Sequence, residues 1–91
     1  MLSHEILPSL LKKLKKLSKK DKPLYEHTMK KIDEIISSFD IEHYKNLRYD
    51  LKDLKRVHIG NFVLVFEYNK KENKITFKDH DHHDSIYKNR Q

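Results

Sequence analysis

Apolar residues recur at intervals of three and four along the N-terminal part of the chain, which is the spacing of one helix face. The first such stripe comprises Leu7, Leu10, Leu11, Leu14 and Leu17. It predicts a helix that opens at Pro8 and ends near Lys20, because Pro23 follows. The lysines between the leucines are interpreted as its solvated face. Residues 2–7 are expected to be either a first edge strand or a lead-in.

A second helical stripe follows directly. Asp21 is a suitable N-cap, and Pro23 is tolerated in the first turn of the helix that begins there. The apolar face of this helix comprises Tyr25, Met29, Ile32, Ile36 and Phe39. Two amphipathic helices joined by a tight turn indicate an antiparallel pair, and neither helix can bury its stripe fully against the other. A third layer is therefore expected, with Phe39 in the core.

In the second half of the chain the pattern changes to the alternation of a β-sheet. Within residues 54–59, the side chains of Val57 and Ile59 fall on one face, and those of Arg56 and His58 fall on the other. The apolar face is expected to pack on the helices. Arg56 and His58 are then expected on the open side of the sheet.

Two turn signals separate the strands. Gly60-Asn61 is a two-residue hairpin signal and contains the only glycine of the chain. Residues 62–68 give the strongest strand, residues 69–73 a second turn and residues 74–79 a third strand. Two helices followed by an antiparallel meander predict an α+β fold, with two antiparallel helices packed on a twisted antiparallel sheet of about four strands. Residues 1–91 are expected to form one domain.

Composition narrows the classes of partner. The chain has 20 lysines and arginines against 14 acidic residues, which gives a net charge of +6. A basic surface attracts polyanions, so nucleic acid is the first class, an acidic protein the second and an anionic membrane the third. Without cysteine, disulfides and thiolate metal sites are excluded. No apolar run is long enough to span a bilayer and no signal peptide is visible, so a cytoplasmic protein is expected.

Residues 79–87 are the densest stretch of chemically active groups, with three histidines, three aspartates and a tyrosine. On a continuing strand, such a pattern would suit zinc or nickel. No distant ligand set is evident in the sequence, so no metal or other cofactor is expected. His80 and Asp81 are interpreted as a solvated polar end. Three more histidines have no neighbouring constellation and are expected at the surface: His4, His27 and His43.

Three segments together resemble the RelE/ParE superfamily of toxins, and they are most similar to its YafQ-like branch and to archaeal RelE proteins. The segments are residues 44–54, residues 55–59 with 62–68, and residues 79–87, and the leucine-rich helix also fits. The resemblance covers nearly the whole chain and rests on the order and spacing of these segments. It implies the RelE-like microbial RNase fold.

The resemblance also implies a function. Such proteins are toxins of type II toxin–antitoxin systems and act as ribosome-dependent, metal-independent endoribonucleases. They cut mRNA in the ribosomal A site, where the ribose 2′-OH attacks the adjacent phosphate. The implied partners are the ribosome, mRNA and a cognate RelB-like antitoxin that blocks the toxin, with no membrane and no small-molecule cofactor.

The resemblance assigns roles to five residues. His83 and Tyr87 match a terminal His-x-x-x-aromatic motif: His83 is assigned as general acid, and Tyr87 would stack on a base or bind the phosphate. His58 is assigned as general base, although the direction between the two histidines stays open. Arg56 would stabilise the phosphorane, and Lys45 stands where the YafQ-like branch has another catalytic histidine.

At three positions the sequence departs from the family pattern. Lys45 replaces a histidine, Val63 stands where RelE has an arginine, and Asn61 stands where the YafQ-like branch has an aspartate. The alternative is a non-catalytic RNA- or protein-binding member of the same fold, such as a ParE-like gyrase inhibitor, against which His58 and His83 argue. Three basic residues are candidates for RNA backbone contact, antitoxin contact or plain surface: Arg48, Lys52 and Lys55.

Overall fold

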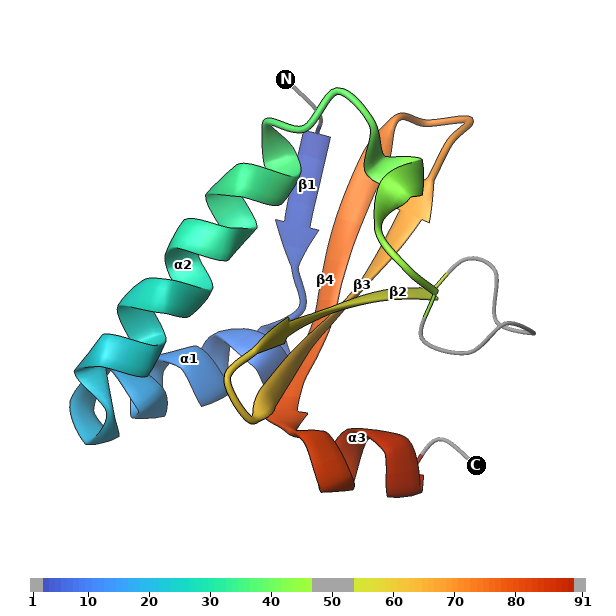
Figure 1. Ribbon diagram of the computed structural model, residues 1–91. Coiled ribbons are helices and arrows are strands. Elements are labelled where there is room, and N and C mark those ends of the chain that lie inside the picture. The colour runs from blue at the N-terminus through green and yellow to red at the C-terminus, as the bar shows by residue number, and fades with distance from the viewer. Residues whose placement is uncertain (1–2, 47–53, 90–91) are drawn as a thin grey trace.

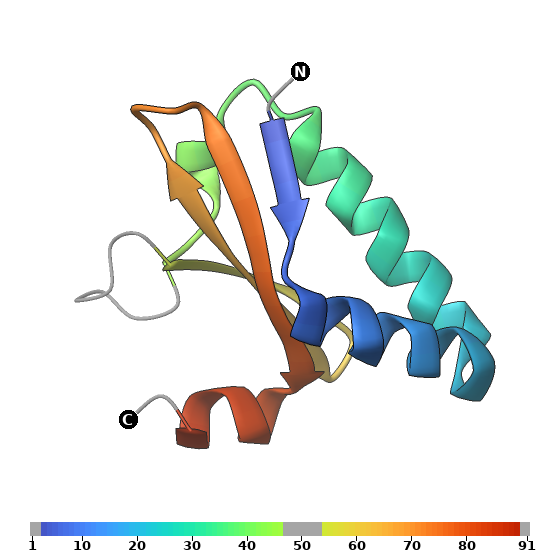
Figure 2. The ribbon, with the colours of Figure 1, turned by 180° about the vertical axis from the view of Figure 1, so that it is seen from behind.

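The computed structural model describes residues 3–46 and 54–89 and has the expected α+β architecture. Two helices cover one face of a four-stranded sheet, and a short C-terminal helix lies on its other side (Figure 1, and Figure 2 from behind). The strands are β1 (Ser3–Ile6), β2 (Leu54–Ile59), β3 (Phe62–Asn69) and β4 (Lys74–His82). The helices are α1 (Pro8–Lys20), α2 (Lys22–Ile36) and α3 (His83–Asn89), with a 3₁₀ turn at Ile41–His43. In the described part of the chain, no helix is long and apolar enough to cross a membrane.

The sheet has the strand order β1-β4-β3-β2. Strands β2, β3 and β4 form the expected antiparallel meander, with Ile59 opposite Phe62 at the first hairpin. The sheet differs from the prediction at one edge, where β1 runs parallel to β4 and Ser3 pairs with Lys74. A parallel pair needs a crossover connection, and here α1 and α2 form the first part of it. Of the two alternatives for residues 2–7, the edge strand is therefore the one that residues 3–6 adopt.

Both long helices begin where the proline and aspartate signals placed them. α1 begins at Pro8, and Asp21 caps α2 by accepting a hydrogen bond of 3.3 Å from the Leu24 N–H. α2 ends at Ile36, which is about one turn earlier than the predicted stripe. Phe39 therefore lies beyond the helix and is fully exposed, so its predicted place in the core is wrong.

Two apolar clusters lie on opposite faces of the sheet. Buried members of the larger cluster, which joins α1 and α2 to the strands, include Leu10, Leu14, Ile32, Ile35, Leu64, Phe66 and Phe77. The smaller cluster consists of Val63, Val65 and Ile86, with Leu54 and Tyr87 packed against it. Residues 63–66 of β3 are thus buried on both faces, which explains the uninterrupted apolar run. The smaller cluster holds α3 on the sheet, and burial of the Ile86 side chain contributes about 1.5–3 kcal/mol to this docking.

Candidate active site

The open face of the sheet carries Arg56 and His58, as the alternation in β2 predicts. Val57 and Ile59 pack with the larger cluster on the helix side, whereas the His58 side chain is exposed. His58 lies directly opposite Val63 of β3, so its ring stands beside the smaller cluster that anchors α3. The first half of the predicted site is therefore placed by strand register alone.

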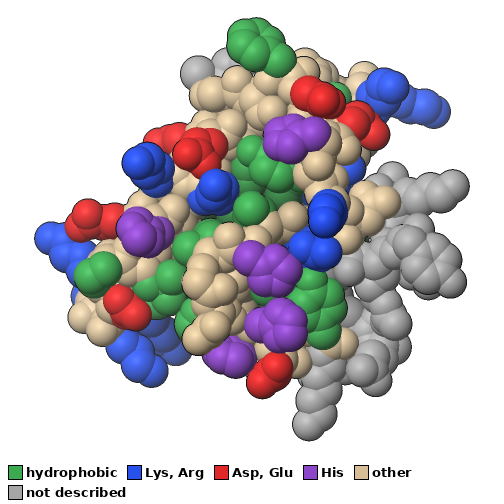
Figure 3. Space-filling model, viewed as in Figure 1, with side chains coloured by type: hydrophobic (Ala, Val, Ile, Leu, Met, Phe, Trp, Pro, Cys, Tyr) green, Lys and Arg blue, Asp and Glu red, His purple; other side chains and the backbone are tan. Residues whose placement is uncertain are grey.

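α3 brings the tail to this face beside the β2–β3 turn. The turn is tight because Gly60 takes a φ of +62°, and the Asn61 carbonyl accepts a hydrogen bond of 2.8 Å from the His83 N–H. The ring centroids of His58 and His83 lie 5.8 Å apart, and the Tyr87 centroid lies 4.8 Å from His83 and 6.4 Å from His58. Figure 3 shows histidine side chains gathered at this end of the molecule, with lysine or arginine side chains beside them. Together with the arginine of β2, four predicted site residues are neighbours.

The Arg56 guanidinium is directly linked to His58. Its Nη1 donates a hydrogen bond of 3.3 Å to Nδ1 of His58. Because arginine only donates, Nδ1 must carry the lone pair of a neutral imidazole. Partial desolvation of the ring, the Arg56 charge and the neighbouring His83 all lower the pKa of His58, which favours the neutral ring. Nε of Arg56 is buried and has no hydrogen-bond partner among the described residues, and the guanidinium as a whole is a charged donor suited to an anionic oxygen.

Asp84 belongs to the site, although the sequence prediction gave it no role. Its Oδ1 lies 3.3 Å from Nδ1 of His83, so the carboxylate accepts the Nδ1–H hydrogen bond. This contact orients the imidazole and leaves Nε2 as the nitrogen available for proton transfer. The adjacency of an aspartate and a candidate catalytic histidine was the sequence signal for this pairing.

Lys45 lies next to Arg56 on the segment that leads away from the 3₁₀ turn. The Lys45 carbonyl accepts a hydrogen bond of 2.9 Å from the Arg56 N–H. Its side chain is exposed and borders the same hollow as Arg56. The five predicted catalytic residues therefore occupy one region of the molecule. Two predicted RNA contacts, Arg48 and Lys52, lie outside the described residues.

The predicted RNA contact at Lys55 is wrong for this structure. Only 5% of Lys55 is exposed, and its ammonium donates to the Tyr44 carbonyl at 3.2 Å and to Oδ1 of Asn46 at 3.3 Å. The alternation of β2 places Lys55 on the same face as Val57, which packs on the helix-side cluster. Lys55 therefore stabilises the chain segment beside β2 instead of offering a charge to RNA.

Positions 61 and 63, where the sequence departs from the RelE and YafQ-like patterns, have different surroundings. Val63 is fully buried in the cluster that contains Ile86, and it lies directly opposite His58. An arginine at this position would have to displace the apolar anchor of α3. Asn61 is exposed at the turn, and its backbone carbonyl, not its side chain, holds the first residue of α3.

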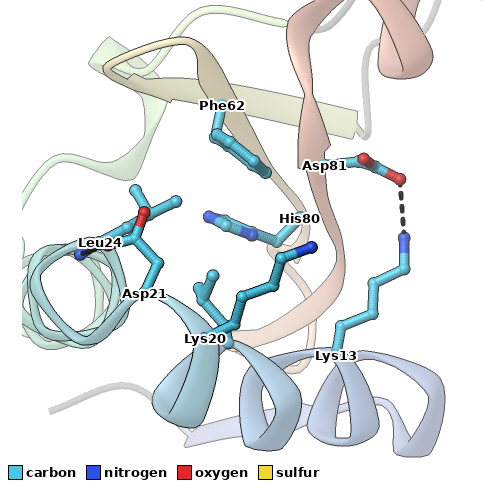
Figure 4. Close-up of a pocket in the computed structure, with 8 residues that line it drawn as sticks. Lys13, Lys20, Asp21, Leu24, Phe62, His80 and Asp81 are labelled. Carbon is cyan, nitrogen blue, oxygen red and sulfur yellow. Dashed lines mark hydrogen bonds and ion pairs between the residues drawn. The ribbon is translucent and has the colours of Figure 1, made fainter.

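His80 does not belong to a solvated polar end, as predicted, because only 4% of it is exposed. It stacks on Phe62 and lines a hollow of about 460 Å³ between β4 and the α1–α2 junction (Figure 4). Nε2 of His80 lies 3.0 Å from Oγ1 of Thr28, which in turn lies 2.9 Å from the Leu24 carbonyl. Thr28 has one hydroxyl hydrogen and donates it to that carbonyl, so His80 donates through Nε2–H. Burial lowers the pKa of His80 and favours its neutral form.

The aspartates at the end of β4 are tied to α1. Lys13 donates to Oδ1 of Asp79 at 2.7 Å and to Oδ2 of Asp81 at 3.1 Å, so Asp81 is ion-paired and not simply solvated. In the part of the chain that the structure describes, no group of three or more histidine, aspartate or glutamate side chains is arranged to hold a metal ion. Three other histidines are exposed, as predicted: His4, His27 and His43.

The family of this chain is shown by a similar protein sequence. No family model matches the chain. It is 51% identical over 89 residues to a Methanocaldococcus jannaschii protein named "Putative toxin RelE4", and the match covers 97% of this chain and 93% of that one. The chain belongs to the RelE toxin family. An uncharacterized Methanosarcina mazei protein is 43% identical to this RelE-family chain over 84 residues, covering 91% of this chain and 95% of that one.

Solved RelE structures share the fold of this RelE-family protein. The isolated Escherichia coli RelE toxin superposes with a TM-score of 0.74 at 17% identity, over 99% of this chain and 95% of that one. A chain of the archaeal RelE–RelB complex from Pyrococcus horikoshii superposes with a TM-score of 0.66 at 17% identity, over 90% of this chain and 94% of that one. The fold and the family predicted from the order of the motifs are confirmed.

Proposed function

We propose that this RelE-family toxin belongs to a RelBE-type toxin–antitoxin system and inhibits translation as an endoribonuclease that cuts mRNA in the ribosomal A site. The observation that carries the proposal is the meeting of Arg56, His58, His83 and Tyr87 on the open face of the sheet. Cleavage of RNA through its own 2′-OH needs a base, an acid and a cation at the phosphate. These four side chains supply all three groups and an aromatic ring.

The two histidines divide the proton transfers. His58 takes the proton from the 2′-OH through its Nδ1 lone pair while the 2′-oxygen forms a bond to phosphorus. His83 gives a proton to the departing 5′-oxygen as the P–O5′ bond breaks, which leaves a 2′,3′-cyclic phosphate. A ring separation of 5.8 Å allows both rings to reach atoms of one phosphodiester, because each proton transfer spans a single hydrogen bond.

Arg56 connects substrate binding to the activation of His58. Its hydrogen bond occupies the same Nδ1 lone pair that His58 needs as a base. A phosphate oxygen is a stronger partner for the guanidinium than a neutral imidazole is. When Arg56 turns to the phosphate, it stabilises the charge on the phosphorane and releases the His58 lone pair. Lys45 adds a second cation beside Arg56, and Tyr87 stacks on a neighbouring base.

The proposed partners are a RelB-like antitoxin, the ribosome and mRNA, and the proposed location is the cytoplasm. Support for the antitoxin comes from the Pyrococcus horikoshii relative, which was solved as a RelE–RelB complex. A Mycobacterium tuberculosis toxin–antitoxin complex, RelBE2, also matches this fold, with a TM-score of 0.61 at 14% identity, over 89% of this chain and 90% of that one. Support for mRNA comes from the basic charge of +6 and from the site geometry.

The test is primer extension on cellular mRNA after the toxin is induced. Wild-type protein is expected to arrest growth and to produce new mRNA ends within translated codons. His83→Ala should lose both effects, while His4→Ala is the matched control because His4 is an exposed histidine on β1. Growth arrest with intact mRNA would instead favour a non-catalytic, ParE-like mode of action.

A further inference from the structure

A second hollow borders the proposed active site at Arg56. It has a volume of about 590 Å³, and its walls include Tyr44, Lys45, Asn46 and Arg56. This volume lies in the usual range for sites that bind a small organic ligand, and a nucleobase is small enough to fit in it. Since Arg56 also contacts His58, a phosphate held by Arg56 would place a neighbouring nucleotide at this hollow.

The orientation of the Asn46 side chain is fixed by a buried lysine. Lys55 is 5% exposed and donates to Oδ1 of Asn46 at 3.3 Å. An ammonium group has no lone pair, so the amide oxygen and not the amide nitrogen must face Lys55. The two N–H groups of Asn46 therefore point away from Lys55. An antiparallel bridge between Asn46 and Lys55 holds the two backbones together and keeps this arrangement in place.

Several groups in the described lining of the hollow are hydrogen-bond donors. The Lys45 ammonium, the Asn46 amide N–H groups and the Arg56 guanidinium can all donate, and the described lining also includes the Glu42 carboxylate and the His43 ring. Tyr44 contributes an aromatic ring that is held by an edge-on contact with Phe66, with the centroids 5.7 Å apart, and by the His43 ring at 4.1 Å. An aromatic ring held in place beside hydrogen-bond donors is suited to a nucleobase that presents acceptors.

We propose that this hollow takes the nucleobase next to the scissile phosphate, and that Asn46 selects a base with a keto oxygen at its reading edge. Guanine and uracil present O6 and O4 as acceptors, whereas adenine and cytosine present an amino group at the equivalent position. An amide that offers only N–H groups pairs with the keto oxygen and leaves the amino group unpaired. This specificity rests on the ribonuclease function proposed above.

The experiment measures cleavage rates on purified ribosomes that hold mRNAs with A, C, G or U at each position flanking the cut. Wild-type toxin is expected to cleave about tenfold faster when guanine or uracil occupies one flanking position, the size expected for one hydrogen bond to a base. Asn46→Asp keeps an oxygen on Lys55 and replaces the N–H groups with an acceptor. This variant is expected to reverse the preference toward adenine and cytosine. The ratio of rates is the readout, because an added negative charge slows all four substrates together.

Asn46→Ala provides a second measurement and is expected to give similar cleavage rates on all four bases. Thermal unfolding of each variant checks that it folds. Equal rates for the wild-type protein, or an Asn46→Asp variant that keeps the wild-type preference, would overturn the inference and leave the ribonuclease function intact. If Asn46→Asp does not fold, an unchanged preference in Asn46→Ala overturns it. Absence of cleavage on every mRNA would overturn both proposals.

Discussion

Ile86→Ala should detach α3 from the sheet while the rest of the fold persists. Ile86 is 2% exposed and packs with Val63 and Val65, and α3 has only seven residues. A helix this short does not form alone in water, so its docking maintains it. Replacing a buried isoleucine with alanine costs about 2–5 kcal/mol. This loss is at least as large as the contribution of about 1.5–3 kcal/mol that burial of Ile86 makes to the docking of α3. The undocked form should therefore become a major population.

Amide hydrogen exchange measures this detachment directly. In Ile86→Ala the amides of α3 should exchange at nearly unprotected rates, while those of β3 and β4 keep most of their protection. Cleavage should fall by about tenfold or more, because a loss of about 1.4 kcal/mol in docking lowers the docked fraction tenfold once undocking dominates. Leu11→Ala is the control, since Leu11 is an aliphatic side chain with 52% exposure and its truncation should change neither quantity.

Either of two results would contradict a separately docked α3. Cleavage at the wild-type rate in Ile86→Ala would mean that the position of α3 does not control the site. An equal loss of protection in α3 and in the central strands would mean that α3 unfolds only with the whole domain. In that case, the smaller cluster would be part of the main core instead of a separate anchor.

Two further predictions concern ionisation. Burial lowers the pKa of His80 in the folded chain, so the unfolded chain binds more protons below about pH 6.5, and folding stability should fall as the pH drops through this region. Urea unfolding at pH 7.5 and pH 5.5 should show this loss, and His80→Gln should reduce it while His4→Gln should not. Partial desolvation, Arg56 and His83 lower the pKa of His58, so Arg56→Gln should move the acid limb of the cleavage–pH profile upward. Arg56→Lys, which keeps the charge, should leave that limb near its wild-type position. An unchanged limb in Arg56→Gln would mean that the charge of Arg56 does not lower the pKa of His58.

Local signals were sufficient for most of the fold. Pro8 and Asp21 mark helix starts, and Gly60 marks the hairpin, because each residue has a backbone or capping preference that acts within a few positions. The open-face placement of Arg56 and His58 follows from the same kind of short-range alternation. The parallel pairing of β1 could not be predicted in this way, since it depends on where a strand about 70 residues later returns.

The error at His80 has a specific structural cause. Ile75 and Phe77 face the helix-side cluster, so regular alternation would point Asp79 and Asp81 inward and His80 outward. The register of β3 and β4 shifts between Val65 and Phe66, and β4 reverses its faces at this point. A bulge of this kind has no strong sequence signal. Regular alternation would, however, turn two aspartates toward the core, and this conflict indicates an irregular strand. Lys55 is a different case, because alternation alone placed it on the inner face.

In the proposed mRNA cleavage reaction, His58 is the base and His83 is the acid. Single-turnover cleavage on ribosomes, with the 5′-oxygen at the cut replaced by sulfur, distinguishes these two roles. A thiolate leaves without a proton because its conjugate acid has a pKa of about 8.5. His83→Ala, which should lose about 10²–10⁴-fold on normal mRNA, should therefore regain most of that rate on the sulfur substrate. His58→Ala should remain slow on both substrates, and a His83→Ala variant that is equally slow on both would contradict the assignment.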